Sequence, residues 1–160
     1  MKKNIDTFNA GFTLIELLVV IAIIGLLAAV VLASVGSARN KGADAAVKQQ
    51  LNAARSQGEL FAGANRNSYD GVCVDTQANY GFASILLGAA QTTGSTVDTA
   101  DTANAWNLVG CVDATTTWVV EAPLTSSAAG AGNARYWCVD SSGNAATTST
   151  ALGAASVRCP

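Results

Sequence analysis

Residues 11–25 read GFTLIELLVVIAIIG, and this stretch decides which fold the chain can adopt. Residues 12–35 continue it as an apolar run in which Glu16 is the only charged side chain. A helix over such a run, about 24 residues at 1.5 Å each, is long enough to cross a bilayer core of about 30 Å. The sequence therefore predicts a long amino-terminal helix that can sit in a membrane.

A simple membrane anchor would not need an ionisable residue such as Glu16 within its apolar run. An ionised side chain inside a membrane helix costs roughly 2.5–3.5 kcal/mol, so it needs a partner. The polar residues 1–11 carry two lysines and are typical of a short cytoplasmic n-region. A cut after Gly11 would keep the apolar helix and expose the amine of Phe12, about 6 Å from Glu16 along the helix axis. That amine could belong to the same chain or to a neighbouring subunit, and only the second arrangement would drive assembly and fix the axial register.

The motif GFTLIELLVV, residues 11–20, resembles the class III signal of type IV pilins and of the related pseudopilins of type II secretion. The resemblance extends over residues 2–39. It consists of a cleavage glycine, a phenylalanine next to it, a glutamate five positions after the glycine, and the apolar run. It implies cleavage between Gly11 and Phe12 by a membrane prepilin peptidase, N-methylation of Phe12, and assembly through Phe12 and Glu16.

The resemblance also implies a structural filament subunit without catalytic activity. The precursor would sit in the lipid bilayer of the inner membrane. The assembly machinery of that membrane would then extract it into a helical polymer of identical or related pilins, a pilus on the cell surface. Gly25 matches a glycine at which pilin helices loosen, whereas Ala33 departs from the helix-bending proline of many pilins.

The motif leaves the role within the family open. The chain could instead be a pseudopilin of a type II secretion system, or a minor or DNA-uptake pilin. An alternative from another class is a membrane-tethered extracytoplasmic binding module that takes glycans through Trp106, Trp118 and Trp137. Core packing is the simpler explanation of the three tryptophans.

Composition argues against catalysis. The chain has 160 residues, a formal net charge of −2 and no histidine. It therefore lacks the commonest general base and metal ligand. It has no Ser-His-Asp or Cys-His set and no phosphate-binding glycine loop. Its basic residues are interspersed with acidic ones, unlike those of a nucleic-acid surface. We expect no cofactor and no specific nucleic acid.

Two acidic loops are the best metal candidates. Asp98 and Asp101 in one loop, and Asp140 in the other, carry oxygens that could hold Ca²⁺, and secretion pseudopilins are similar in using a calcium in their sheet loops. Neither loop has the charges of an EF-hand. The aspartate, serine, glycine and asparagine residues of both loops also favour turns, which explains them adequately. We expect turns and no bound metal.

Four cysteines lie beyond the apolar run, and none forms a C-x-x-C pair. An even number in an exported domain predicts two disulfides, for which three pairings are possible. We favour Cys73–Cys111 with Cys138–Cys159, because each closes a local loop. In the pilin resemblance, the second would bound the carboxyl-terminal loop called the D-region.

The helix is expected to continue to about Phe61 with a changed character. An apolar stripe at steps of three and four predicts one buried face. Asp44 with Lys48, and Arg55 with Glu59, are spaced as ion pairs on the exposed face. The stripe consists of Ala43, Val47, Leu51, Ala54, Gly58 and Phe61.

The rest of the chain predicts a small head that covers this stripe. Alternation of apolar and polar residues predicts strands, and an antiparallel sheet with one face on the helix would bury both surfaces. The expected strands are Trp106–Val112, Thr115–Ala122 and Ala134–Asp140, with Val157–Cys159 as a marginal edge strand. We also expect a short helix over Tyr80–Ala90 and an exposed loop over Gln91–Asp101.

The predicted fold is therefore α+β and pilin-like, a long amino-terminal helix packed against a small antiparallel sheet. The expected organisation is a leader over residues 1–11, a hydrophobic transmembrane or filament-core helix over 12–35, an amphipathic continuation over 36–62, and a head with two disulfides over 63–160.

Overall fold

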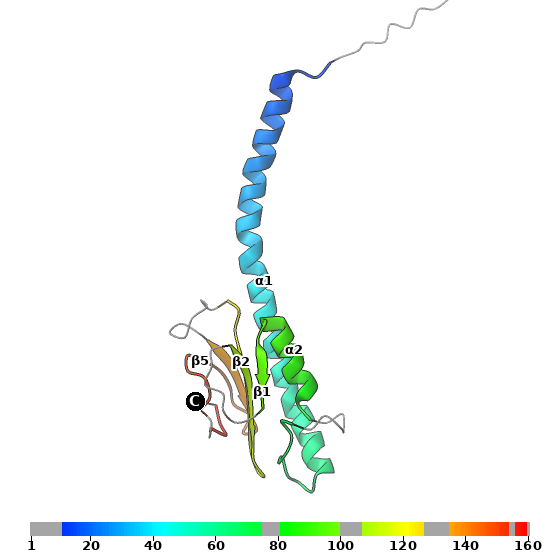
Figure 1. Ribbon diagram of the computed structural model, residues 1–160, viewed down its shortest axis with the longest axis vertical. Helices are drawn as coiled ribbons and strands as arrows, with labels where there is room; N and C mark the ends of the chain where they lie inside the picture. Colours follow the sequence, from blue (N-terminus) through cyan, green and yellow to red (C-terminus); the bar gives the residue numbers. More distant parts are fainter. Residues whose placement is uncertain (1–10, 75–80, 100–106, 127–134, 154–155, 160) are drawn as a thin grey trace, which may run out of the picture. The chain divides into compact units, whose positions relative to one another are not determined.

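The computed structural model describes residues 11–74, 81–99, 107–126, 135–153 and 156–159. It has the predicted α+β architecture, in which helix α1 (Leu14–Ala64) precedes helix α2 (Ala83–Thr93) and a five-stranded sheet (Figure 1). The chain divides into two units, residues 1–38 and 39–160, and the boundary falls inside α1. The second unit, which we call the head, contains the second half of α1, α2 and the sheet.

The sheet of the head is mostly antiparallel. Its strands follow the chain in space, in the order β1-β2-β3-β4-β5. The first pair is parallel and the other three are antiparallel. The strands are β1 (Thr96–Asp98), β2 (Leu108–Asp113), β3 (Trp118–Pro123), β4 (Tyr136–Asp140) and β5 (Ala145–Thr148).

The main core lies between the inner face of the sheet and the two helices. The predicted stripe of α1 supplies Val47, Leu51, Ala54 and Phe61, all buried. They pack with side chains of α2 and with the inward residues of β2, β3 and β4. The apolar stripe predicted from the sequence is therefore the face of α1 that packs against α2 and the sheet.

A close contact between α1 and the sheet depends on a glycine. A Cβ atom on Gly58 would lie 2.8 Å from Nε1 of Trp118 and 3.3 Å from the ring of Phe82. The two rings themselves meet edge to face, with centroids 4.9 Å apart. Because α2 begins beside Gly58 and passes Gln50 at Gly88, it runs antiparallel to this part of α1 (Figure 1).

The outer face of the sheet is also covered, which was not predicted from the sequence. All of β3 except Pro123 is buried. A second cluster forms on this face and includes Leu152 and Val157 from the carboxyl-terminal segment. Its other members are Val112, Val119, Cys138 and Cys159.

Two expectations about the head were wrong. The stretch Gln91–Asp101 is not simply a loop, because residues 91–93 end α2 and Thr96–Asp98 form β1 in parallel register with Leu108–Gly110. Val157–Cys159 is not a strand. The backbone N–H of Cys159 instead donates to the Asp140 carboxylate, at 3.0 Å, and so does not enter a ladder.

Element boundaries also moved, and β5 was missed. Helix α1 extends to Ala64, and α2 covers Ala83–Thr93 rather than Tyr80–Ala90. The three expected strands exist with shifted or shortened ends. Strand β5 consists of two alanines and two threonines, so it carries no apolar alternation, and its pairing with β4 makes it a strand.

The four residues of α1 that were expected to form ion pairs contact other segments instead. Asp44 is buried, and its carboxylate accepts hydrogen bonds from the backbone N–H of Thr125 at 2.6 Å and of Ser126 at 3.2 Å. The Thr125 hydroxyl also donates to Asp44, at 2.8 Å. The expected exposed position of Asp44 was therefore wrong, because the turn after β3 uses it as an anchor.

The other three expected ion-pair members likewise have partners in the head. The ammonium of Lys48 lies 4.8 Å from the ring centroid of Trp137. The Arg55 guanidinium donates to the Gly143 carbonyl at 2.8 Å, and Glu59 accepts from the Tyr69 hydroxyl at 2.8 Å. Spacing within a helix could not reveal these contacts, because they depend on residues far along the chain.

Candidate functional site

The amino-terminal helix begins with a capping box. Thr13 precedes the first helical residue, and Glu16 is three positions later, the spacing at which the two side chains cap each other. Oε2 of Glu16 accepts from the Thr13 backbone N–H at 2.9 Å and from its hydroxyl at 2.7 Å. The Glu16 N–H donates to the Thr13 hydroxyl at 3.3 Å. The carboxylate therefore has a local partner in Thr13.

This role of Thr13 was not predicted from the sequence, although the T-x-x-E spacing is the signature of a capping box. The second carboxylate oxygen of Glu16, Oε1, accepts no hydrogen bond from the described residues. A shallow depression beside it is lined by Phe12, Ile15, Glu16, Val19 and Val20. The carboxylate thus keeps one oxygen available at the edge of an apolar surface.

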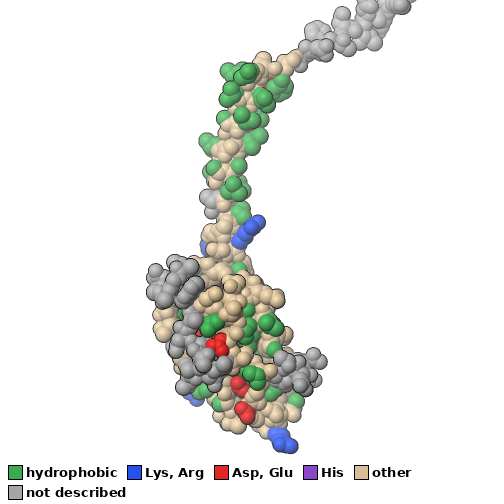
Figure 2. Space-filling view, viewed as in Figure 1, with side chains coloured by type: hydrophobic (Ala, Val, Ile, Leu, Met, Phe, Trp, Pro, Cys, Tyr) green, Lys and Arg blue, Asp and Glu red, His purple; other side chains and the backbone are tan. Residues whose placement is uncertain are grey.

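The first half of α1 presents apolar side chains in every direction. Its large apolar side chains from Phe12 onward are exposed, with Phe12 and Leu14 each at 78%. Figure 2 shows hydrophobic side chains gathered along this stretch of the helix. Among the described residues, α1 is the one helix that is long and apolar enough to cross a membrane, and none of its most apolar window is buried by the rest of the chain.

The expected cleavage site lies in accessible backbone. Residues 11–13 precede the helix, and both Gly11 and Phe12 are exposed. A Cβ atom on Gly11 would meet nothing within 4 Å, and Gly11 does not have a positive φ. Nothing in the described chain therefore demands a glycine at this position.

The metal candidates do not form a described cluster. Among the described residues, no group of three or more histidine, cysteine, aspartate or glutamate side chains could hold a metal ion. Asp98 ends β1, Asp140 ends β4, and Asp101 lies outside the described residues.

Asp140 instead organises the turn after β4. Its Oδ1 atom accepts from the N–H groups of Ser142 and Asn144, and from the Ser142 hydroxyl at 2.6 Å. Its Oδ2 atom accepts from the N–H of Cys159. Burial alone would raise the pKa of Asp140, but the hydrogen bonds from Ser142, Cys159 and Asn144 outweigh it and lower the pKa. These contacts are those of a turn-forming aspartate.

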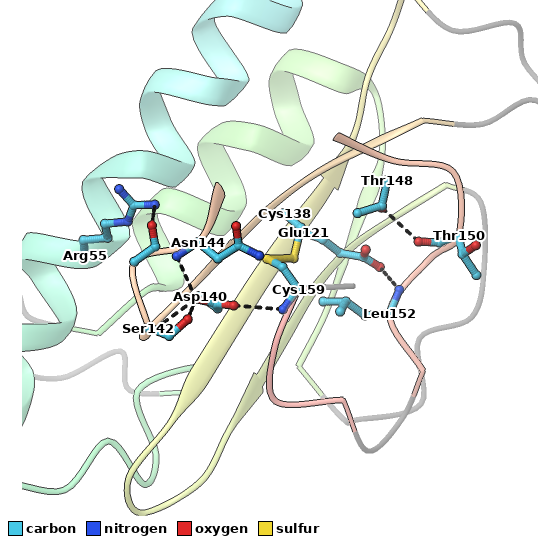
Figure 3. The surroundings of a disulfide bond; sticks show 11 residues. Arg55, Glu121, Cys138, Asp140, Ser142, Asn144, Thr148, Thr150, Leu152 and Cys159 are labelled. Atoms are coloured by element: carbon cyan, nitrogen blue, oxygen red, sulfur yellow. Dashed lines mark hydrogen bonds between the residues drawn. A yellow bond between two sulfur atoms is a disulfide. The ribbon is translucent and has the colours of Figure 1, made fainter. Parts of the chain in front are cut away.

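Both disulfides join the cysteine pairs that the sequence favoured. Cys73 is bonded to Cys111, which ties the segment after α1 to β2. Cys138 is bonded to Cys159, which ties β4 to the carboxyl-terminal segment (Figure 3). The described part of the chain leaves no cysteine free. The cysteines therefore stabilise the head.

Two of the three tryptophans have structural contacts. Trp118 is buried at 1% exposure against Phe82, and Trp137 packs at the edge of the main core beside Lys48. Trp106 lies outside the described residues. A glycan platform built from all three gains no support from these positions.

The amino-terminal geometry coincides with a known sequence family. The prokaryotic N-terminal methylation motif matches residues 7–32, the segment that contains Gly11, Phe12 and Glu16. The amino-terminal segment of the chain therefore resembles that of proteins that carry this motif.

Two curated relatives match this pilin-like chain. The type IV wide pilus major component PilA4 of Thermus thermophilus is 48% identical over 59 residues, which cover 37% of this chain and 44% of the relative. A fimbrial protein of Moraxella nonliquefaciens is 41% identical over 83 residues, covering 48% of this chain and 53% of the relative. The chain thus spans about half the length of these relatives. No solved structure matches it significantly.

Proposed function

We propose that the chain is the precursor of a structural subunit of a type IV pilus-like filament. The observation that carries the proposal is the first half of α1, which exposes large apolar side chains on every side and has Glu16 as its only charged residue. Such a surface is stable in a lipid bilayer or against copies of itself. The bilayer would hold the precursor, and the filament would bury the same helix.

Cleavage between Gly11 and Phe12 by a prepilin peptidase would prepare the subunit for assembly. No contact in the described chain requires a glycine at position 11. Recognition of Gly11 by the peptidase would explain why a glycine is present there. The exposed, non-helical position of residues 11–13 supports access by such an enzyme. N-methylation of the new Phe12 amine is part of the same proposal, supported by the methylation motif.

The new amine would bind Glu16 of a neighbouring subunit. Thr13 occupies Oε2 of Glu16, whereas Oε1 is open beside the apolar depression. Opposite unit charges about 4 Å apart attract by roughly 4 kcal/mol at an effective dielectric constant of about 20. That gain is similar to the roughly 2.5–3.5 kcal/mol that the buried charge costs. Pairing would therefore make correct axial register the favourable way to bury Glu16.

The names of the two relatives support a pilus subunit over a secretion pseudopilin. One is a major component of a wide pilus and the other is a fimbrial protein. We therefore propose that identical or related pilins are the main partners, that inner-membrane machinery assembles them, and that the filament lies outside the cell. If the protein is scarce in sheared surface filaments, it is instead a minor pilin or a pseudopilin.

The assembly prediction is tested with Glu16→Gln, which keeps the shape of the side chain but removes its charge. The variant should insert into the membrane and lose its leader, yet filaments should disappear from sheared cell surfaces in electron micrographs. Glu59→Gln is the matched control, because it makes the same change on an exposed position of the same helix. Normal filament yield from Glu16→Gln would refute the proposed pairing.

The processing prediction is tested with Gly11→Val. Mass spectrometry of the membrane fraction should find the uncut precursor, heavier than the mature subunit by the leader. Gly25→Val is the control, since Gly25 also has open space around it but lies outside the proposed cleavage site. A Gly11→Val protein that still begins with free or methylated Phe12 would contradict the proposed role of the glycine.

A further inference from the structure

A buried carboxyl group lies under the carboxyl-terminal segment of the head. Glu121 is in β3, opposite Gly110 of β2 and Cys138 of β4, and only 2% of it is exposed. It shares the outer face of the sheet with the cluster that contains Val119 and Leu152 (Figure 3). A carboxyl group in such a place is costly to ionise.

One oxygen of this carboxyl holds the chain that covers it. Oε1 of Glu121 accepts a hydrogen bond from the backbone N–H of Leu152 at 2.8 Å. Oε2 is buried without a hydrogen-bond partner among the described residues. We call residues 149–153 and 156–159 the strap. The Glu121 carboxyl of β3 thus contacts the strap at Leu152, between the two ends of the strap.

The ends of the strap are held by different means. Thr148, at the end of β5, donates from its hydroxyl to the carbonyl of Thr150 at 2.9 Å. Cys159 is fixed twice, by its disulfide to Cys138 and by its N–H bond to Asp140. Between these ends, Leu152 is held by its N–H bond to Glu121 and by the packing of its side chain in the second cluster. Loss of the Glu121 contact would therefore loosen the strap at Leu152 while the chain stays attached at both sides.

The charged surroundings of Glu121 do not stabilise its ionised form. Tyr136, on the same face of β4, is also buried, and burial followed by the Glu121 charge raises its pKa. Asp140, farther along the same face, is a second acid. From β2 the facing residues are the uncharged Gly110 and Val112. The charged residue of the strap, Arg158, is exposed.

We propose that Glu121 is a proton-operated latch, which holds the strap closed over the sheet when protonated and releases its middle when ionised. The ionised group needs more donors than the single Leu152 N–H, and water reaches Oε2 only if the strap moves. Burial raises the pKa of Glu121 to about 7, and the Leu152 hydrogen bond opposes that rise only partly. Closure is thus complete below the ordinary pKa of a carboxyl, and it weakens as the pH rises from there to about 7.

Hydrogen exchange of the Leu152 amide tests the latch in the full chain in detergent micelles. After correction for the intrinsic exchange rate, the protection factor should fall roughly 40-fold from pH 5 to pH 7. The opening constant rises by up to about tenfold per pH unit between the two pKa values, and it should level off above pH 7. In Glu121→Gln, which imitates the neutral acid, the protection factor should not change with pH. Glu59→Gln should keep the wild-type profile.

A wild-type protection factor that does not change with pH would overturn the proposed latch. That result is expected if a bound water satisfies Oε2 in both protonation states. A Glu121→Gln profile as steep as that of the wild type would also overturn it. If that variant does not fold, carbon-13 NMR of the wild-type carboxyl decides the question. Glu121 should titrate near pH 7 together with the Leu152 amide shift, and titration near pH 4.5 would refute the proposal.

Discussion

The two halves of α1 contain the same kinds of side chain in opposite environments. In the second half, Val47 and Leu51 are completely buried by the head. In the first half, Val30 is 66% exposed and Leu26 is 69% exposed. Both halves are helical without interruption, so local sequence preference does not separate them. The difference is that the second half has its partner within the chain, whereas the first half needs one from outside.

The head, by contrast, is complete in itself. It has a core on each face of its sheet, and each core contains one disulfide. Three charged side chains of α1, those of Asp44, Lys48 and Arg55, contact loops and strands of the same unit. The proposed filament subunit would gain from this independence, because the stability of its head would not depend on neighbouring subunits.

The largest expected effect on the free energy of unfolding comes from removing a disulfide. Both disulfides lie in the head, so their removal tests how far the head is stabilised by its own contacts. Chain entropy predicts a loss of about 4 kcal/mol for Cys73→Ala with Cys111→Ala, and about 3 kcal/mol for Cys138→Ala with Cys159→Ala. The larger value follows from the longer sequence separation, 38 against 21 residues. Denaturant unfolding followed by tryptophan fluorescence measures both losses. The reverse order would show that native-state contacts outweigh loop closure.

A matched pair of leucines on one helix tests the comparison more directly. Leu51→Ala removes a buried side chain from the main core and should lower the free energy of unfolding of the head by about 3 kcal/mol. Leu26→Ala changes an exposed side chain and should lower it by less than about 0.5 kcal/mol. Equal losses in detergent-solubilised full chain would show that the first half of α1 is packed on something within the molecule.

The smallest expected effect concerns two glycines of α1. Gly58→Ala places a methyl group against Trp118 and should destabilise the head by about 2 kcal/mol, the usual cost of overpacking. Gly63→Ala meets nothing within 4 Å and gains helix propensity, so it should be neutral or stabilising by up to about 1 kcal/mol. Thermal unfolding followed by circular dichroism compares them. Equal melting temperatures would mean that the Trp118 ring moves aside without cost.

Strong local signals made part of this structure predictable. The apolar run and the stripe from Val47 to Phe61 are patterns within one helix, and they gave α1 and its buried face. Aromatic and β-branched residues marked β3 and β4. The amino-terminal motif was the most specific signal, because it fixes residue types at fixed spacing over a segment that the head does not cover.

The rest depended on contacts between distant parts of the chain. Strand β1 is three residues long, and pairing with β2 is what orders it. Asp44 was predicted to be an exposed ion-pair partner of Lys48, because the residues that donate hydrogen bonds to it are 81 and 82 positions away in the sequence. Glu121 was predicted only as one residue of an alternating strand, because Leu152 of the strap, which contacts it, is 31 positions away in the sequence. Local periodicity carries no information about such closures.

The most direct test of the account is the structure of the filament, determined by electron cryomicroscopy at a resolution that shows side chains. The account predicts that the mature chain begins at Phe12 and that its amine lies within about 4 Å of the Glu16 carboxylate of an adjacent subunit, the usual limit for an ion pair. A filament in which the carboxylate binds only its own Thr13, with the Phe12 amine elsewhere, would contradict it.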